Sequence, residues 1–309
     1  MQHQNYRIVD WARSISHQSW QVYVRLLKIL VPALVVVKIL QQLGLVQWIG
    51  GALAPLMGLL GLPDFMGLVW AAALMTNLYT AIAIFYQTVG DTPLSVAQIS
   101  VMGSLLLIGH SLPVEGAVAK YAGVSWRATL LLRVGGALLF AWLVHVFCRY
   151  ANVLQGPASL GWRPSTTVEP DILVWTVSQL QTLAAIWVVI IALVALLDVL
   201  KRWGVERWIH RGLNPLLKLL GIGPQAASIT VIGFTLGLSY GAGLLIRDVK
   251  NGILSKRDSV LALCFLSLCH SVIEDTLLFV MLGADIFIIL AARLGFAVVL
   301  VMIIARWRP

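Results

Sequence analysis

The chain alternates long apolar stretches with short polar connections, and the stretches fall into two sets of five. The first set covers residues 26–46, 48–62, 67–88, 97–119 and 128–148. The second set covers residues 174–200, 208–222, 226–246, 259–281 and 284–305. Several stretches reach the ~20 apolar residues that a helix needs to cross a bilayer. The pattern therefore predicts an all-α polytopic membrane protein.

The second set is a copy of the first, displaced by 160 residues. The register holds without a gap for about a hundred residues. The matched positions include Trp48 with Trp208, Pro55 with Pro215, Gly61 with Gly221, His110 with His270, and Arg133 with Arg293. Internal duplication in so apolar a chain is typical of membrane transporters. It predicts a functional site at polar positions that both copies keep in mid-membrane.

The charges of the connecting loops indicate how the two copies are oriented. The loop after the first segment has no Lys or Arg in the first copy, but it has Lys201, Arg202, Arg207 and Arg211 in the second. The loop after the fourth segment shows the opposite bias, with Lys120 and Arg127 in the first copy only. Because cytoplasmic loops collect Lys and Arg, this reversal predicts inverted repeats in a bacterial inner membrane, with both termini cytoplasmic.

This topology divides the chain into four regions. Residues 1–25 form an amphipathic cytoplasmic segment, 26–149 the first repeat, 150–172 an extracytoplasmic linker, and 173–309 the second repeat. The short segments 48–62 and 208–222 would span only about 22 Å as helices. We therefore expect broken or re-entrant helices. If the short segments do not cross the membrane, the repeats become parallel and the charge reversal has no explanation.

Composition narrows the function further. Hydrophobic residues make up 60% of the chain and charged residues 11%, with a mean hydropathy of +0.90. The net charge of +9 follows the positive-inside rule, so no nucleic-acid partner is expected; the lipid bilayer is the expected surrounding. P-loop, HExxH and GxSxG motifs are absent, so we expect no enzyme and no cofactor. Transport would use an ion or substrate gradient, or a separate energising partner.

The fourth segments carry the strongest candidate chemistry. His110, Ser111 and Glu115 align with His270, Ser271 and Asp275, and Glu274 is an additional acid. Each histidine lies halfway along its segment, where ionisable side chains are costly and usually face a cavity or a partner. Pro113 is expected to kink or break the first of the two helices. Buried polar clusters that only hold helices together are the alternative.

These side chains suit several kinds of substrate. Imidazoles and carboxylates bind transition metals, and His110, Glu115, His270 and Glu274 form the expected set of metal ligands, for a metal that is substrate and not cofactor. The same groups could relay protons or bind a polar organic solute. The His–acid spacings of five and four residues are not a sharp metal signature, since only positions four apart share a face of a regular helix.

The third segments provide a second set of candidates. Asn77 and Tyr79 in the first copy, and Ser239 and Tyr240 in the second, are expected to line the substrate path. Tight helix packing is an equal alternative for this region, because Gly237 and Gly241 allow helices to approach closely. Arg133 and Arg293 lie inside the fifth segments. They are expected either to snorkel to an interface or to pair with the acids.

The repeated unit resembles a known family. Each copy has a short segment with the pattern L-x-P-L-x-x-L-L-G, then a Gly- or Thr-rich segment, and then a helix interrupted by polar residues. This order resembles the nucleoside-recognition, or Gate, family, which is related to modules of ferrous-iron permeases and of concentrative nucleoside transporters. The resemblance covers about residues 25–149 and 185–309. It implies two Gate repeats and a solute or ion pathway, without naming a substrate or carrying over any functional residue.

The sequence thus predicts a transporter that works by alternating access, with its site at the repeat interface. A divalent metal cation is the first expectation for the substrate. A nucleoside or another small polar organic solute is the second. The alternative from a different class is a membrane scaffold or assembly partner that transports nothing. Assembly into a homo-oligomer is left open.

Overall fold

The computed structural model describes residues 2–121, 123–159, 172–237 and 254–307. Within these residues the chain is helical, apart from one antiparallel bridge between Ser95 and Pro157. Five helices there are long and apolar enough to cross a membrane: Val96–Tyr121, Trp126–Tyr150, Ile172–Leu200, Lys256–Met281 and Phe287–Arg306. The prediction of a helical membrane protein is therefore confirmed.

The helices of the first copy are α1 (Gln2–Gln42), α2 (Leu45–Leu59), α3 (Met66–Met75), α4 (Leu78–Val89), α5 (Val96–Ile108), α6 (Leu112–Tyr121), α7 (Trp126–Leu130), the π-helix η1 (Leu131–Gly135) and α8 (Gly136–Tyr150). Those of the second copy are α9 (Ile172–Arg202), α10 (Val205–Leu219), α11 (Pro224–Leu236), α13 (Lys256–Leu268), α14 (Val272–Met281), the π-helix η2 (Phe287–Ala292) and α15 (Arg293–Trp307).

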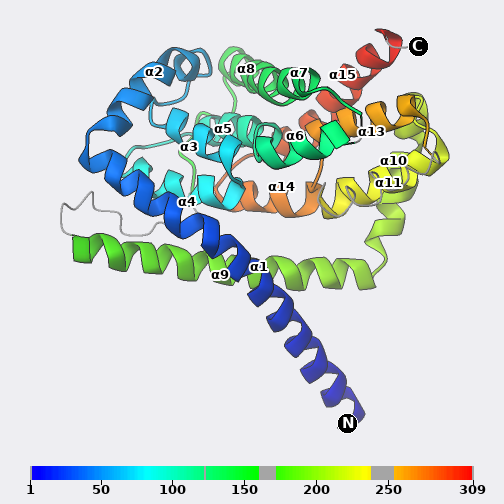
Figure 1. Cartoon of the computed structure of the whole chain (residues 1–309), viewed down its shortest axis with the longest axis horizontal. Coiled ribbons are helices and arrows are strands. Elements are labelled where there is room, and N and C mark those ends of the chain that lie inside the picture. Colours follow the sequence, from blue (N-terminus) through cyan, green and yellow to red (C-terminus); the bar gives the residue numbers. More distant parts are fainter. Residues whose placement is uncertain (1, 122, 160–171, 238–253, 308–309) are drawn as a thin grey trace.

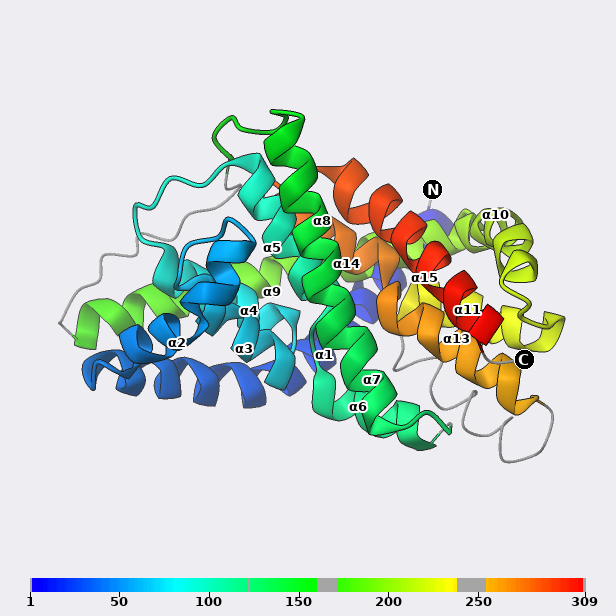
Figure 2. The same cartoon turned by 90° about the horizontal axis from the view of Figure 1, so that it is seen from above.

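The two copies lie side by side and share a central group of helices. In both views α2 and α3 lie at one end of the molecule and α10 and α11 at the other (Figure 1, Figure 2). Between them α5 packs against α8 of its own copy and against α14 and η2 of the second copy. Nearly every side chain of α5 is buried, as expected for a helix that is apolar all round.

Helices α1 and α9 cross outside this central group and pack on each other (Figure 1). Trp11 donates from its indole nitrogen to Asp198 at 2.6 Å, and the Tyr23 hydroxyl donates to the carbonyl of Leu183 at 3.1 Å. Residues 1–25 were predicted as a separate amphipathic segment. From Gln2 onward they continue without interruption into residues 26–42, so the first apolar stretch belongs to a 41-residue helix.

The fourth segment of each copy begins with the same cap. Ser95 accepts a hydrogen bond from the Gln98 amide at 3.2 Å, and Gln98 accepts one from the Ser95 amide, so a capping box starts α5. Ser255 accepts from the Asp258 amide at 3.0 Å at the start of α13. Such caps satisfy amide groups that have no partner within the helix. Both fourth segments therefore start in the same register, which fixes where each histidine falls.

Close packing of α2 on α3 yields a stability prediction. A Cβ atom at Gly67 would lie 2.7 Å from the Cβ of Leu53, whereas one at Gly58 would meet nothing within 4 Å. We expect Gly67→Ala to lower the free energy of unfolding by about 1–3 kcal/mol, because neither backbone can move cheaply. Gly58→Ala should leave it unchanged or raise it by up to ~1 kcal/mol. Unfolding in mixed micelles, followed by tryptophan fluorescence, measures both; equal effects would contradict the predicted contact.

Candidate functional site

Both fourth segments break at the same place. Helix α5 ends at Ile108 and α6 starts at Leu112, so His110 lies in the gap, and His270 lies in the equivalent gap between α13 and α14. Ser111 and Ser271 both have φ of 49°, in the left-handed region. That conformation costs a non-glycine residue roughly 1–2 kcal/mol. Its recurrence in both copies shows that the surrounding structure imposes it.

Pro113 is not what breaks the helix. It lies in the first turn of α6, where an amide hydrogen would have no partner within the helix in any case. The second copy has the same break with Ile273 at the equivalent position. The prediction of a broken helix is confirmed, but its cause is the left-handed serine and the contacts that hold it.

Two buried arginines hold the open ends of these helices. Arg133 donates from Nη2 to the carbonyl of His110 at 2.6 Å, and Arg293 donates from Nη2 to the carbonyl of His270 at 2.9 Å. Both arginines are fully buried, so neither snorkels to an interface. Each belongs to or directly follows a π-helical turn, a feature that often accompanies functional sites. The guanidinium groups satisfy carbonyl oxygens that the breaks leave without helical partners.

The backbone fixes the protonation pattern of both imidazoles. Nδ1 of His110 lies 2.9 Å from the carbonyl oxygen of Leu106, and Nδ1 of His270 lies 2.7 Å from that of Leu266. A carbonyl oxygen can only accept, so each Nδ1 must carry the hydrogen. In a neutral imidazole the other nitrogen is then a bare acceptor. When both rings are neutral, both Nε2 atoms therefore present lone pairs.

These lone pairs converge on one point together with a carboxylate. The two Nε2 atoms of His110 and His270 are 3.3 Å apart. Oε1 of Glu115 lies 3.5 Å from Nε2 of His110 and 3.3 Å from Nε2 of His270. Among the described residues this is the cluster with the composition and spacing to hold a metal ion. All three side chains are buried.

Glu115 also connects the cluster to an arginine. Its Oε2 pairs with Nη1 of Arg133, which donates in addition to the carbonyl of Ser267 at 3.0 Å. One carboxylate oxygen thus neutralises the guanidinium and the other faces the histidines. Arg133 itself contacts both copies, because Ser267 belongs to α13.

The other two predicted acids do not join this cluster. Glu274 accepts a hydrogen bond from the Tyr79 hydroxyl at 2.6 Å, so Glu274, expected as a metal ligand, points to α4. Asp275 is buried, and its Oδ2 has no hydrogen-bond partner among the described atoms. The four-residue spacing of His270 and Glu274 assumes a regular helix, and the break at Ser271 removes that geometry.

The third segment of the first copy is joined to the break. Ser111 donates from its amide to the carbonyl of Ala73 and from its hydroxyl to that of Thr76, both at 2.8 Å. Asn77 accepts from the Thr80 amide at 3.0 Å, so its side chain caps α4. Ser271 donates to the carbonyl of Gly233 at 3.4 Å in the second copy. Ser239 and Tyr240 lie outside the described residues.

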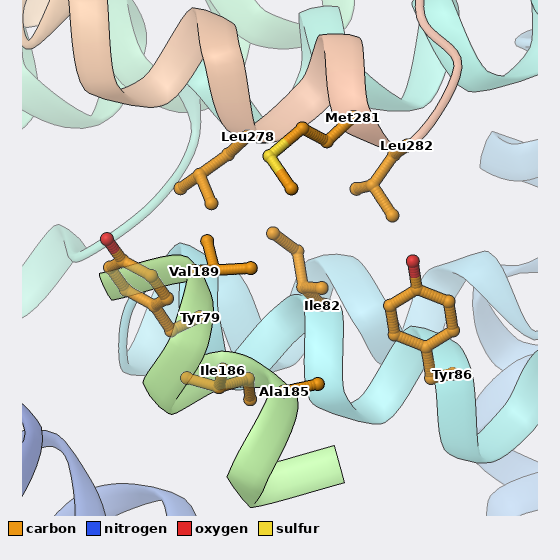
Figure 3. Close-up of a pocket in the computed structure, with 9 residues that line it drawn as sticks. All are labelled: Tyr79, Ile82, Tyr86, Ala185, Ile186, Val189, Leu278, Met281 and Leu282. Carbon is orange, nitrogen blue, oxygen red and sulfur yellow. The ribbon is translucent and has the colours of Figure 1, made fainter. Parts of the chain in front are cut away.

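A cavity of about 210 Å³ lies beside Tyr79, between α4, α9 and α14 (Figure 3). Its wall is mainly apolar and includes Ile82, Ile186 and Leu278. Tyr79, whose hydroxyl bonds Glu274, lines the cavity, whereas neither histidine does. The paired histidines are 6% and 4% exposed, so the cluster is closed to solvent.

Arg133 and Arg293 were not among the predicted site residues, although they organise it. The sequence does carry a signal for them. Each follows its histidine by 23 residues, within an apolar segment, in both copies. A charge repeated at the same distance from a repeated histidine is better explained by a shared contact than by snorkelling.

Comparisons with known proteins agree with the repeat pattern. Residues 23–125 and 183–291 each match the Gate family, described as nucleoside recognition. The chain is 31% identical over 291 residues to "Uncharacterized membrane protein YvoD" of Bacillus subtilis (strain 168), and the alignment covers 91% of each protein. No solved structure matches the chain.

The buried ion pair predicts a large stability effect at Arg133. Arg133→Met would leave the Glu115 carboxylate and two carbonyl oxygens without their partner, which should cost about 3–5 kcal/mol of unfolding free energy. Arg127→Met, at an exposed position in α7, is the matched control and should change it by less than about 0.5 kcal/mol. Unfolding in mixed micelles measures both. Similar values for the two variants would show that the pair does not stabilise the fold.

Proposed function

Since the chain belongs to the nucleoside-recognition (Gate) family, we propose that this membrane protein is a transporter and that its substrate is a divalent metal cation bound between His110 and His270. The family and the helical membrane architecture support a transporter-like protein. The choice of substrate is our inference from the geometry of the histidine–glutamate cluster.

One observation carries the choice of a metal. The three acceptor atoms form a triangle with sides of 3.3, 3.3 and 3.5 Å. Ligands bound 2.0–2.1 Å from a tetrahedral zinc-like ion lie about 3.3–3.4 Å apart. The triangle therefore has the size of one face of such a tetrahedron. Its fourth position would be free for water or for passage of the ion.

The surroundings of the triangle also suit a metal. Metal-bound histidines usually donate their second ring N–H to a carbonyl or carboxylate, as both histidines do here. Without a cation, three lone pairs would repel one another in a buried site. A proton between two of the acceptors would relieve this repulsion as well, so proton transfer is the nearest alternative chemistry.

Alternating access fits the way in which the copies supply the ligands. His110 and Glu115 come from the first copy and His270 from the second, so relative motion of the copies would separate the ligands. Equivalent residues meet at His110–His270 and near Tyr23–Leu183, each pair 160 residues apart. Such contacts support a two-fold relation of the repeats. With the loop charges, they support inverted repeats in an inner membrane with cytoplasmic termini.

Two other functions have an observation in their favour. The apolar cavity lined by Tyr79 would suit a small organic solute with one polar group. A scaffold without transport is favoured by the burial and mutual pairing of the histidines. A scaffold, however, gives no reason for two Nε2 atoms and a carboxylate oxygen to converge at the spacing of metal ligands.

Metal binding tests the proposal directly. Purified protein in detergent is titrated with Fe(II), Mn(II), Co(II) and Zn(II), and we expect saturable binding near one ion per chain. The His110→Ala/His270→Ala variant should lose it, since two of the three ligands are removed. Glu115→Gln should bind at least about tenfold more weakly, whereas Glu274→Gln should stay within about threefold of wild type, because Glu274 bonds Tyr79 and not the cluster.

Stability measurements on the same variants separate ligand loss from unfolding. If no metal binds saturably to the folded wild-type protein, the metal proposal is wrong. That result would favour transport of an organic solute or a scaffold function. Equal losses in Glu115→Gln and Glu274→Gln would contradict the assigned geometry. Metal uptake by proteoliposomes, lost in the histidine variant, would then distinguish transport from binding alone.

A further inference from the structure

A second pocket, with a polar lining, lies between α10 and α11. These two helices lie at the end of the molecule opposite α2 (Figure 2). The pocket has a volume of about 420 Å³. Its walls consist of Arg207, His210 and Arg211 from α10 and Ser228, Val231 and Ile232 from α11. Two guanidinium groups and an imidazole thus face one pocket that also has an apolar wall.

The internal duplication shows that the fold does not need these charges. The positions equivalent to Arg207, His210 and Arg211 in the first copy are Gln47, Gly50 and Gly51, and Leu68 stands in place of Ser228. Helix α2 nevertheless has the same 15-residue length as α10 and the same packing on the following helix. We therefore infer that the basic residues have a binding role that is specific to the second copy.

Within the described part of the chain, the basic side chains of the pocket have no partner. Among the described residues, no hydrogen bond or ion pair joins Arg207, His210 or Arg211 to another group. Other basic side chains do find partners: Arg202 pairs with Asp198 at 2.6 Å, and the buried Arg133 pairs with Glu115. The pocket is thus free to bind an external anion.

The location of the pocket indicates which anion it meets. Helix α10 begins at Val205, directly after the apolar span Ile172–Leu200 ends, so its first turns lie at the depth of lipid head groups. Trp208 is 71% exposed and Leu219 64% exposed on the same helix. A helix that combines arginines with exposed Trp and Leu is typical of the membrane interface.

We propose that this pocket binds the phosphodiester head group of an anionic phospholipid. Arg207 and Arg211 are spaced four residues apart on one face of α10, and guanidinium groups bind phosphate oxygens through paired hydrogen bonds. Val231 and Ile232 form the part of the wall that an acyl chain would contact. Basic pockets between membrane helices bind anionic lipids in this way. The site is independent of the metal proposal and shares no residue with it.

Lipid titration of the full-length protein tests this site. Native mass spectrometry gives the affinity for dioleoylphosphatidylglycerol and for dioleoylphosphatidylcholine. Wild type should prefer the anionic lipid, and Arg207→Gln/Arg211→Gln should bind it about 25-fold more weakly, at about fivefold per basic side chain. Lys120→Gln/Arg127→Gln removes two exposed charges outside the pocket and should change the affinity by less than threefold.

A charge-adding variant and a competition experiment test the lipid proposal further. Ser228→Asp adds a negative charge to the exposed wall on α11 without removing an arginine, and it should weaken phosphatidylglycerol binding as well. Inorganic phosphate and soluble glycerophosphoglycerol should not compete at millimolar concentration. If they displace the lipid, the pocket is a soluble-anion site and the lipid proposal is wrong. The proposal also fails if the folded arginine variant, checked by circular dichroism, binds like wild type.

Discussion

The hydrogen bonds from Arg133 and Arg293 to the carbonyls of His110 and His270 are the contacts on which the rest of the site depends. A broken helix inside a membrane leaves carbonyl oxygens that no water can satisfy. The guanidinium groups satisfy them and hold the left-handed turns in place. Those turns orient each imidazole so that its Nδ1 contacts a carbonyl of its own helix and its Nε2 faces the histidine of the other copy. Without the arginines, the breaks would be costly and the rings would have no fixed direction.

The frame is symmetric, but the ligands within it are not. The amides of Glu115 and Asp275 both donate to the preceding serine carbonyl at 3.0 Å, so the two backbones are equivalent. The glutamate is one methylene longer, and it reaches Arg133 and both imidazoles. No ion pair joins Asp275 to another described residue, and one of its oxygens has no partner. The two copies thus hold their histidines in equivalent backbone positions, but only Glu115 places a carboxylate between the two imidazoles.

Much of this arrangement could be predicted from the sequence, and the failures share one cause. The apolar stretches predicted the helical segments, the duplication predicted the paired histidines, and Pro113 predicted a break that the structure shows to have another cause. The sequence predicted both Glu115 and Glu274 as ligands, but the spacing argument for Glu274 assumes an uninterrupted helix. The left-handed conformation of Ser111 and Ser271 depends on contacts with other segments, including Ala73 and Thr76, which no local pattern reveals. The sequence also left open whether Arg133 snorkels to an interface or pairs with the acids. The partners of Arg133 lie on other helices, so no local pattern could decide between the two.

The way in which the ligands are divided between the copies has a mechanical consequence for the proposed transport cycle. The complete triangle exists only while the copies are closed on each other, because His270 comes from the second copy and His110 and Glu115 from the first. Opening toward either side would leave an ion with the ligands of one copy, which lowers its affinity and favours release. Arg133 contacts Glu115, His110 and the Ser267 carbonyl of α13, so the same motion would also remove one of its acceptors. In the proposed cycle, closure and ion binding would therefore be coupled through the interface between the copies.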